Sequence, residues 1–458
     1  MMRLSEAAVA THGQLIGQDA LFTSVGTDSR NLASQQLFVA LQGEKFDGHD
    51  YAKQAFEHAA AGVLIQRGMS SLPAAVLVKD TRLALGDLAA YWRSKFDMPI
   101  AAITGSSGKT TVKEMLASIL RAATESVENV LATQGNLNND IGLPLTMLKL
   151  RSHHQYAVLE MGMNHAGEIS YLTKLAKPSV ALVNNAGTAH IGELGSVEAI
   201  AKAKGEIFQG LAADGTAIFN ADDDFAPLWK AITTHHKQMT FGLAAHADVS
   251  AEYQLHANAS SLVLKTPVGK LAINLPVAGL HNVRNALAAT SVAIAMGVSL
   301  DAVAQGLQQF TGVKGRLQLM QGINGAHVID DTYNANPASM KAAIDVLAAQ
   351  SGEKIFVMGD MGELGEEGAA MHAEIGRYAK SAGVQHLYGF GELSTQATNV
   401  FGQGGQHFDE IETLAAAIVR NLNAQTTVLV KGSRFMRMER VVQLVTTKST
   451  TQNNGEQH

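Results

Sequence analysis

Cysteine is absent from the 458 residues of this chain. Disulfides, thiolate metal sites and a cysteine nucleophile are therefore excluded, and the composition suits a reducing cytosol. No run of 18 or more apolar residues occurs, so we expect no transmembrane helix. The opening stretch MMRLSEAAVATHGQL lacks the apolar core of a signal peptide. These absences predict a cytoplasmic protein without membrane insertion.

An excess of basic charge is also missing. The net charge is −6 and the lysines and arginines are scattered, so nothing indicates a nucleic-acid partner. The apolar fraction of 46% and charged fraction of 17% are those of an ordinary globular protein. The length allows about three domains of roughly 150 residues each. We expect a monomer, with a disordered polar tail at residues 448–458.

Short apolar runs alternate with helical patterns along most of the chain. Runs such as MPIAAITG, YAVLEMG and KIFVMGD end in Gly, Asn or Asp, and helix-like segments such as KTTVKEMLASILRA lie between them. This alternation predicts parallel sheets covered by helices on both faces. Alternating strands between residues 245 and 280 predict a β-rich insertion, and the apolar run at 285–297 predicts a buried helix.

Two breaks in the pattern predict three α/β domains. We expect an N-terminal α/β domain at 1–82 and a central domain at 83–312, with a doubly wound, mostly parallel sheet. A Rossmann-like C-terminal domain is expected at 313–447. Ligands of such folds bind beyond the carboxyl ends of the strands. The candidates at those ends are Gly105, Glu160, Asn184, Asp331, Asp360 and Lys431.

The stretch AAITGSSGKTT at 101–111 is similar to a phosphate-binding loop, but its spacing is short. The usual motif has four residues between its first Gly and Gly-Lys-Ser/Thr, whereas Gly105 is followed by only two before Gly108. Backbone N–H groups of the glycines and serines, and the following helix N-terminus, can surround a phosphate. Lys109 can reach the outer phosphates and Thr110 can ligate Mg²⁺. The alternative is a strand–helix turn made of small residues.

Three further positions stay open on residue type alone. Glu160 ends a strand, where a carboxylate suits Mg²⁺, although a solvated glutamate is the alternative. His190 follows another strand, but Mg²⁺ rarely binds nitrogen, so chemistry alone makes it a weak ligand. Lys202 and Lys204 are expected near the start of a helix, where simple solvation is the ordinary role of a lysine.

Taken together, these stretches resemble the Mur ligase family, the ATP-dependent amide-bond synthetases of bacterial cell-wall assembly. TGSSGKT is similar to the family's short TGxxGKT loop, and the resemblance covers nearly the whole chain. The strings GNLNNDIGLPLT, DDTYNANPASM, MGDMGELG and VKGSRFMRME are most similar to the member that joins D-alanyl-D-alanine to UDP-N-acetylmuramoyl-tripeptide. The resemblance implies this ADP-forming reaction, through an acyl phosphate, in cytoplasmic peptidoglycan precursor synthesis.

The resemblance also implies the cofactors ATP and two Mg²⁺ ions and assigns residues to them. Asn285 matches the family's adenine-contacting asparagine, although residue type alone predicts a helix-surface asparagine. Arg316 matches the nucleotide-contacting arginine, and Asp331 matches the ribose-contacting aspartate, with Asp330 as the alternative. Tyr333 and Asn336 are expected to line the same cleft. The full ATP set is Gly105, Ser106, Ser107, Gly108, Lys109, Thr110, Thr111, Asn285, Arg316, Asp331 and Tyr333.

The catalytic and metal-binding residues follow from the same resemblance. The set is Lys109, Thr110, Glu160, His190 and Lys204. Lys204 rather than Lys202 matches the lysine that the family carbamylates. Carbamylation converts an ammonium, which repels Mg²⁺, into a carboxylate-like group that supports a metal site.

The outer domains are similar to the family's substrate modules. The N-terminal domain resembles the uridine-nucleotide module and the C-terminal domain the module that brings in the dipeptide, whose carboxylate suits Arg or Lys. The implied substrate contacts are Ser29, Arg30, Asp47, Gly48, His49, Asn138, Asp360, Glu363, Lys431 and Arg434. By residue type alone, the first five predict turns.

Domain closure and two rival functions complete the predictions. The C-terminal domain is expected to close on the central one to exclude water, with Gly312 and Gly315 as hinge positions. One rival is a sister ligase that adds the third stem residue or glutamates to folate, which DDTYNANP and MGDMGELG oppose. The other is a P-loop switch or regulatory NTPase. A GTPase should carry Asn-Lys-x-Asp, and that motif is absent.

Overall fold

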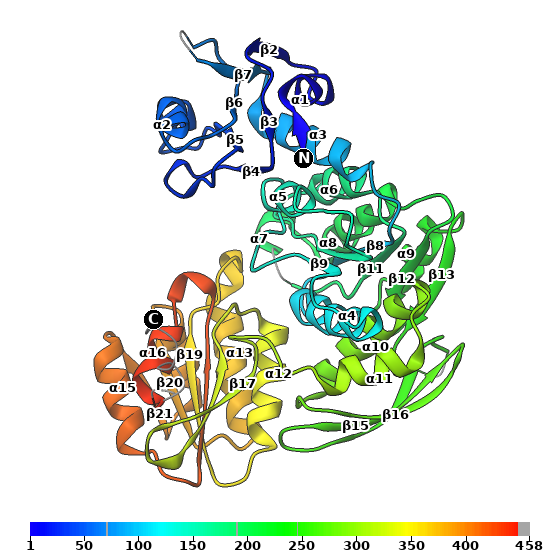
Figure 1. Ribbon diagram of the computed structural model, residues 1–458. Helices are drawn as coiled ribbons and strands as arrows, with labels where there is room; N and C mark the ends of the chain where they lie inside the picture. The colour runs from blue at the N-terminus through cyan, green and yellow to red at the C-terminus, as the bar shows by residue number, and fades with distance from the viewer. Residues whose placement is uncertain (70–71, 189–190, 245, 448–458) are drawn as a thin grey trace, which may run out of the picture.

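The computed structural model describes residues 1–69, 72–188, 191–244 and 246–447. Three α/β domains follow one another along the chain, and Figure 1 shows the N-terminal domain above the central one and the C-terminal domain at the lower left. The predicted α/β class is confirmed. Within the described ranges, the helices are too short or too polar to cross a bilayer. The tail predicted at 448–458 lies outside the described residues.

The N-terminal domain is built on a five-stranded sheet in the order β2-β7-β6-β5-β4. Its strands are parallel except β2, which pairs antiparallel with β7. The elements are β1 (Met2–Arg3), α1 (Leu4–Ala10), β2 (Gln14–Gly17), β3 (Leu21–Phe22), β4 (Ser24–Gly26), β5 (Gln36–Val39), α2 (Ala52–Glu57), β6 (Gly62–Ile65) and β7 (Ala74–Leu77).

The central domain contains a fully parallel six-stranded sheet in the order β13-β12-β11-β8-β10-β9. Its elements up to the insertion are α3 (Thr81–Arg93), β8 (Ile100–Thr104), α4 (Lys109–Thr124), β9 (Val130–Ala132), α5 (Gly142–Met147), β10 (Tyr156–Glu160), α6 (Glu168–Ala176), β11 (Val180–Val183), α7 (Ile191–Leu194), α8 (Val197–Gly205), β12 (Thr216–Asn220), α9 (Ala226–Ile232) and β13 (Lys237–Phe241).

Side chains of β8 alternate between two apolar cores, as the period of a buried strand requires. Ala101 and Ile103 belong to one core, with residues of α4 and of α10 (Leu280–Ala295). Ile100 and Ala102 belong to the other, with residues of α3 and α6. This second core continues into the N-terminal domain, where it includes Leu4 and Phe22. The first two domains therefore share one apolar core.

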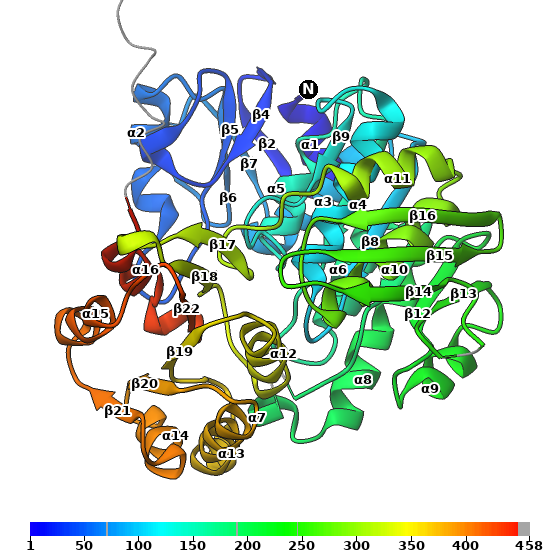
Figure 2. The same cartoon turned by 90° about the horizontal axis from the view of Figure 1, so that it is seen from below.

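The predicted β-rich insertion and buried helix are both confirmed. The strands β14 (Ser250–Leu255), β15 (Ser260–Thr266) and β16 (Gly269–Leu275) form a three-stranded antiparallel sheet, visible beside the central domain in Figure 2. Leu262 and Leu264 of this sheet join the core beneath α10 and α11 (Leu300–Gln308). Between residues 285 and 297, α10 is buried along most of its length.

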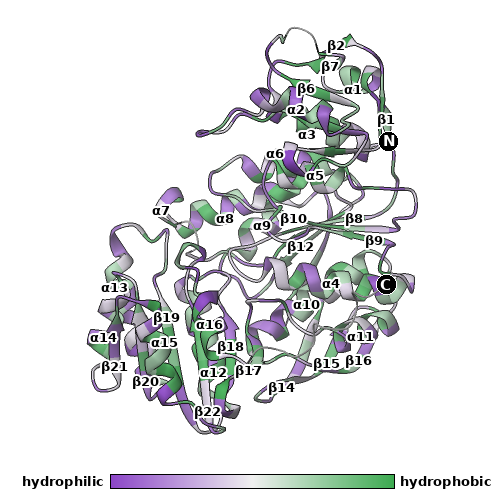
Figure 3. Cartoon of the chain, turned by 60° about the vertical axis from the view of Figure 1, so that its left-hand side comes forward, coloured by the Kyte–Doolittle hydropathy of each residue, from purple (hydrophilic) through white to green (hydrophobic). Residues whose placement is uncertain are grey.

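The C-terminal domain has a six-stranded sheet in the order β17-β18-β22-β19-β20-β21, parallel except for β17. Figure 3 shows green, hydrophobic stretches along strands of this sheet. The elements are β17 (Gln318–Gln321), β18 (His327–Asp331), α12 (Pro337–Ala348), β19 (Glu353–Gly359), α13 (Gly368–Ser381), β20 (His386–Phe390), α14 (Ser394–Phe401), β21 (Gly405–Phe408), α15 (Ile411–Arg420), β22 (Thr426–Lys431) and α16 (Glu439–Val445).

Candidate active site

The phosphate-like loop connects β8 to α4 and packs tightly against two asparagines. Gly108 has φ +79°, and a Cβ there would lie 2.4 Å from Asn285 Oδ1 and 2.6 Å from Asn184 Nδ2. Asn285 is buried rather than on the helix surface, so residue type alone gave the wrong environment. The Asn184 amide donates to Ser107 O at 2.9 Å and to Asn285 Oδ1 at 3.3 Å. A glycine is therefore required at the point where the loop meets α10.

The serine N–H groups of the loop do not face a phosphate as the sequence predicted. Ser106 N–H donates to Asn185 O at 3.1 Å, and Ser107 N–H donates to Asn185 Oδ1 at 2.8 Å. Both bonds hold the loop to the segment that follows β11. The first N–H groups of α4, beginning at Lys109, have no partner within the helix and carry its partial positive charge. They are the groups of this loop that suit an anion.

Lys109 begins α4 and folds back over the loop, where its Nζ donates to Gly105 O at 2.7 Å. Burial lowers the pKa of the Lys109 ammonium, and nearby Glu160 opposes that shift. Arg316 lies close enough to add a repulsive contribution. The arrangement places a desolvated cation beside the loop, where its field is strong because little water screens it.

Glu160, at the end of β10, is buried, and one of its carboxylate oxygens has no hydrogen-bond partner. Its Oε1 accepts from Asn138 Nδ2 at 2.9 Å, while its Oε2 has no hydrogen-bond partner. A buried carboxylate oxygen without a hydrogen-bond partner is costly, and it suits the binding of a cation. Thr110 Oγ1 accepts from Arg316 Nη2 at 3.0 Å. Together, Glu160 and Thr110 offer the hard oxygen ligands that suit Mg²⁺.

The remaining metal candidates lie on and before α8. Lys202 and Lys204 are in its last turn rather than near its start, which corrects the sequence prediction. Lys202 is exposed and pairs with Glu198 at 2.7 Å, whereas Lys204 is only 1% exposed. Burial, followed by the charge of Lys109, holds the pKa of Lys204 well below its usual range. His190 lies outside the described residues. Across the described ranges, no three His, Asp or Glu side chains gather in a metal-binding cluster.

The C-terminal domain reaches the phosphate-like loop through Arg316 and Asn336. The Arg316 guanidinium lies 4.2 Å from the centre of the Tyr333 ring while it bonds Thr110. Asn336, which caps α12, donates its amide to Ser107 Oγ at 3.2 Å. These contacts bring predicted nucleotide residues of two domains together.

A turn joins the two domains beside these contacts. Arg316 N–H donates to Val313 O at 3.0 Å, and Tyr333 N–H donates to Gly315 O at 3.1 Å. Val313 packs against the central core, so the turn has one end fixed in each domain. Both predicted hinge glycines have positive φ, +90° at Gly312 and +70° at Gly315. Their role as hinges stays a prediction.

Asp331 and Lys431 meet at the carboxyl ends of adjacent strands. Lys431 Nζ lies 2.5 Å from Asp331 Oδ2 and 2.9 Å from Asn334 O. Its predicted contact with the dipeptide stays a prediction. Asp331 Oδ1 accepts from Leu317 N–H at 3.1 Å. Burial raises the pKa of Asp331, and Lys431 opposes that rise. The adjacent Asp330 accepts from the Thr332 hydroxyl at 2.6 Å, so its carboxylate is engaged within its own turn.

The other dipeptide candidates have different surroundings. Both Asp360 oxygens accept backbone N–H groups, from Leu393 at 3.1 Å and Ser394 at 2.7 Å. Arg434 is exposed and lies 3.3 Å from Glu439. Glu363 is exposed, and its backbone carbonyl accepts from Gly192 N–H of the central domain at 3.3 Å. Arg434 thus remains accessible, whereas Asp360 is engaged in fixing the start of α14.

The predicted uridine-nucleotide residues cluster in the N-terminal domain, apart from the cleft. His49 is buried: its Nε2 accepts from Gln66 N–H at 3.0 Å, and its Nδ1 lies 2.5 Å from Asp47 Oδ1. At Gly48, a Cβ would lie 2.7 Å from Leu41 O. These contacts stabilise the loop itself.

Ser29 and Arg30 form the other part of that cluster. Ser29 is buried and donates to Gln54 Oε1 at 3.3 Å. Arg30 is 80% exposed in its side chain while it pairs with Asp28 at 2.9 Å. Arg30 therefore keeps a face available to a ligand.

Comparison with known proteins decides the family. The Mur ligase middle domain matches residues 103–293, the Mur ligase glutamate ligase domain matches 315–434, and the Mur ligase catalytic domain matches 21–93. The chain belongs to the Mur ligase family. This Mur ligase is 42% identical to the UDP-N-acetylmuramoyl-tripeptide–D-alanyl-D-alanine ligase of Escherichia coli, over 98% of its own length and 99% of the relative. It is 36% identical to the Bacillus subtilis ligase of the same name, over 93% of each chain.

Solved structures agree with this assignment. A crystal structure of MurF from Acinetobacter baumannii superposes with a TM-score of 0.90 at 39% identity, covering 96% of this Mur ligase and 98% of that chain. MurF from Thermotoga maritima, solved in complex with ADP, gives a TM-score of 0.82 at 28% identity, covering 92% and 96%. The three-domain fold of this Mur ligase is therefore shared with both.

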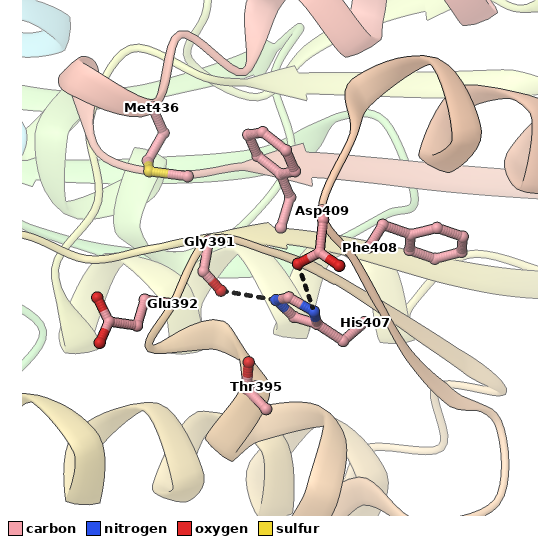
Figure 4. A pocket seen from close by; sticks show the side chains of 8 residues that line it. Gly391, Glu392, Thr395, His407, Phe408, Asp409 and Met436 are labelled. Carbon is pink, nitrogen blue, oxygen red and sulfur yellow. Dashed lines mark hydrogen bonds and ion pairs between the residues drawn. The ribbon is translucent and has the colours of Figure 1, made fainter.

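Two hollows of this Mur ligase lie away from the phosphate loop. One, of about 430 Å³, is in the C-terminal domain (Figure 4), where the His407 ring lies between Gly391 O at 2.7 Å and Asp409 Oδ1 at 3.8 Å. The other, of about 470 Å³, lies where Gln350 Nε2 donates to Ala257 O of the insertion at 2.8 Å. Neither is lined by the predicted ATP residues.

Sequence reasoning missed several residues that shape the site of this Mur ligase. Asn185 holds two N–H groups of the loop, and the doubled asparagine after an apolar strand was the available signal. Lys113 and Thr133 are both fully or almost fully buried near Glu160. Their contacts join separate segments of the chain, so no local sequence pattern predicts their burial.

Proposed function

We propose that this Mur ligase joins D-alanyl-D-alanine to UDP-N-acetylmuramoyl-tripeptide, giving UDP-N-acetylmuramoyl-pentapeptide, ADP and phosphate. The observation that carries the proposal is the full-length match to relatives bearing that activity in their name, at 42% identity for the Escherichia coli ligase. The bonds from Arg316 and Asn336 to the phosphate loop support it, since they place residues of the C-terminal domain beside that loop. The reaction belongs to peptidoglycan precursor synthesis in the cytoplasm, and a monomer suffices for it.

The chemistry requires ATP because a carboxylate has no leaving group that an amine can displace. The terminal carboxylate of the tripeptide attacks the γ-phosphorus, ADP leaves, and an acyl phosphate forms. The amine of D-alanyl-D-alanine then attacks the acyl carbon, and phosphate leaves from the tetrahedral intermediate. Two anions meet in the first step, so the site must neutralise charge. Lys109 supplies that charge when its Nζ exchanges the Gly105 carbonyl for a phosphoryl oxygen.

The residues around Lys109 divide the remaining tasks. The first turn of α4 binds phosphate oxygens, and Asn285 and Arg316 contact the nucleotide from either side of the cleft. Glu160 and Thr110, with His190 and Lys204, would hold Mg²⁺. When bound, Mg²⁺ neutralises and orients phosphoryl oxygens. Arg316 must leave the Thr110 hydroxyl for that oxygen to become a metal ligand.

Lys204 is proposed to be carbamylated. Its burial and lowered pKa favour a neutral amine, which is the form that adds to carbon dioxide. The product is a carboxylate-like group beside Lys109, which offsets the repulsion between the two lysines. Lys204→Ala should lose most activity and regain part of it with short carboxylic acids, whereas Lys202→Ala, which alters an exposed lysine, is the matched control. Equal activity of Lys204→Ala and the parent enzyme would contradict the role.

Phosphate release from ATP, with each substrate omitted in turn, tests the proposed function. Release only in the complete mixture, with the pentapeptide product seen by mass spectrometry, is the expected result. Release without the dipeptide would instead indicate a nucleotide hydrolase that does not ligate. Turnover with a different amino acid in place of the dipeptide would indicate a sister ligase.

A further inference from the structure

A buried cation lies one helical turn beyond Lys109. Lys113 of α4 has 0% exposure, and its Nζ donates to Thr133 O at 2.6 Å. Glu114 Oε1 lies 2.6 Å from the same Nζ and balances its charge. Removing an ammonium from water is unfavourable unless its partners compensate. Such a group is expected to be fixed in place, together with the carbonyl that it binds.

Thr133 transmits this restraint to Glu160. It follows β9 directly and is 1% exposed. Thr133 N–H donates to Val158 O at 3.0 Å, and the Thr133 hydroxyl accepts from Glu160 N–H at 2.9 Å. The backbone of Glu160 is thus held by a side chain at the point where strand pairing with β9 ends.

The segment 133–138, which begins with Thr133, also holds the carboxylate of the Glu160 side chain. Asn138 Nδ2 donates to Glu160 Oε1 at 2.9 Å, and Asn138 O accepts from Gly162 N–H at 2.8 Å. Glu160 is therefore fixed both at its backbone and at one carboxylate oxygen by residues 133–138. Its second oxygen, Oε2, is left unpaired.

We infer that Lys113 and Thr133 are positioning residues that aim the free carboxylate oxygen of Glu160 at the cation of the proposed ATP site. The inference rests on the proposed function only for the identity of that cation. Loss of the Thr133 hydroxyl leaves a buried N–H unpaired and frees the end of β10. Partners that orient a metal ligand are typically worth about 10- to 100-fold in metal affinity.

Three variants of the full chain test this inference. Thr133→Val keeps the shape of the side chain but removes the hydroxyl, and Thr133→Ser keeps the hydroxyl. Thr146→Val is the matched control, because Thr146 is also a buried threonine, at 2%, whose hydroxyl bonds only within its own helix, to Gly142 O at 2.9 Å. Binding of Mn²⁺ in the presence of ADP is measured by the loss of the free Mn²⁺ signal in electron paramagnetic resonance.

We expect Thr133→Val to weaken Mn²⁺ binding about tenfold or more, and both Thr133→Ser and Thr146→Val to stay within about twofold of the parent. Hydrogen exchange at the Glu160 amide should accelerate in Thr133→Val alone. Unchanged Mn²⁺ affinity in Thr133→Val, or equal weakening in Thr146→Val, would overturn the inference. If Thr133→Val does not fold, Lys113→Met must show the same weakening.

Neither readout requires a peptide substrate, so the inference and the proposed function fail separately. A parent enzyme that does not ligate, but whose Thr133→Val variant loses Mn²⁺, would refute the function and keep the positioning role. A parent enzyme that ligates, with a Thr133→Val variant that binds Mn²⁺ normally, would support the function and refute the positioning role.

Discussion

Gly108→Ala should destabilise the phosphate loop. The same substitution at a second glycine, Gly297, provides a reference for the size of this loss. Gly108 has φ +79°, and the added Cβ would lie 2.4 Å from Asn285 Oδ1 and 2.6 Å from Asn184 Nδ2. Gly297, after α10, also has φ +79°, but a Cβ there meets nothing within 4 Å. The two substitutions share the backbone cost, so their difference isolates the clash.

The magnitudes follow from these contacts. An alanine in the left-handed region costs about 1–2 kcal/mol, and Gly297→Ala should lose that amount. Gly108→Ala must also displace two amides, which breaks the bonds from Asn184 to Ser107 O and to Asn285 Oδ1. At about 1 kcal/mol each, the total for Gly108→Ala is about 3–4 kcal/mol. The extra loss of about 2 kcal/mol corresponds to a melting temperature lower by about 3 °C than that of Gly297→Ala, for a cooperative unit of about 300 residues formed by the first two domains.

Thermal unfolding and calorimetric titration with ADP provide the assay. Gly108→Ala should melt below Gly297→Ala and bind ADP more weakly, while Gly297→Ala should bind ADP as the parent does. Because Asn285 supplies one of the clashing atoms, Asn285→Ala should remove part of the penalty in the double variant. Equal melting temperatures for the two glycine variants, with unchanged ADP affinity, would refute the packing argument.

Three further predictions concern charge in the cleft. Lys109→Ala should lower ligase activity by about 10²–10³-fold because the transferring phosphoryl group loses its cation; steady-state phosphate release measures this. Glu160→Gln should preserve the fold, as circular dichroism would show, but raise the Mg²⁺ concentration for half-maximal activity about tenfold or more, since it removes an anionic oxygen. Burial, then the charges of Lys431 and Arg284, lower the pKa of His281 to about 4. The unfolded chain takes up that proton near pH 6.5, so the free energy of unfolding should fall as the pH drops from 7 to 5. The fall is at most about 2 kcal/mol because His281 is partly exposed. His281→Asn should flatten this dependence in melts at the two pH values.

Features encoded locally were predictable from the sequence. The strand ending in Thr104, the helix beginning at Lys109 and the alternating β-rich insertion all follow from periodicity within a few residues. The phosphate-like loop was found for the same reason, since its strand, glycines, lysine and helix are contiguous.

Features that depend on distant segments were not predictable. Lys204 is buried and Lys202 exposed in one helical turn, and only the packing of α8 separates them. Asp360 resembles a ligand at a strand end, yet its carboxylate fixes the start of α14. Asn285 looks like a surface residue until the loop packs on it. In each case the environment of the side chain depends on a neighbour more than twenty residues away or on the burial of a whole helix face.

The apolar core that runs from Leu4 and Phe22 into the sheet of the central domain has a consequence for dissecting the chain. A cut near residue 82 would divide this core between two fragments. Apolar residues on one face of the central sheet, and their partners in the N-terminal domain, would then be exposed to water. A cut near residue 313 would divide the chain between cores, because the buried clusters of the C-terminal domain begin at Ala326 and Ile329. Fragment complementation is therefore best attempted in two pieces rather than three. The first piece would carry the phosphate-like loop and Asn285, and the second would carry Arg316, Asp331 and Tyr333, so the predicted ATP residues would be divided between the two.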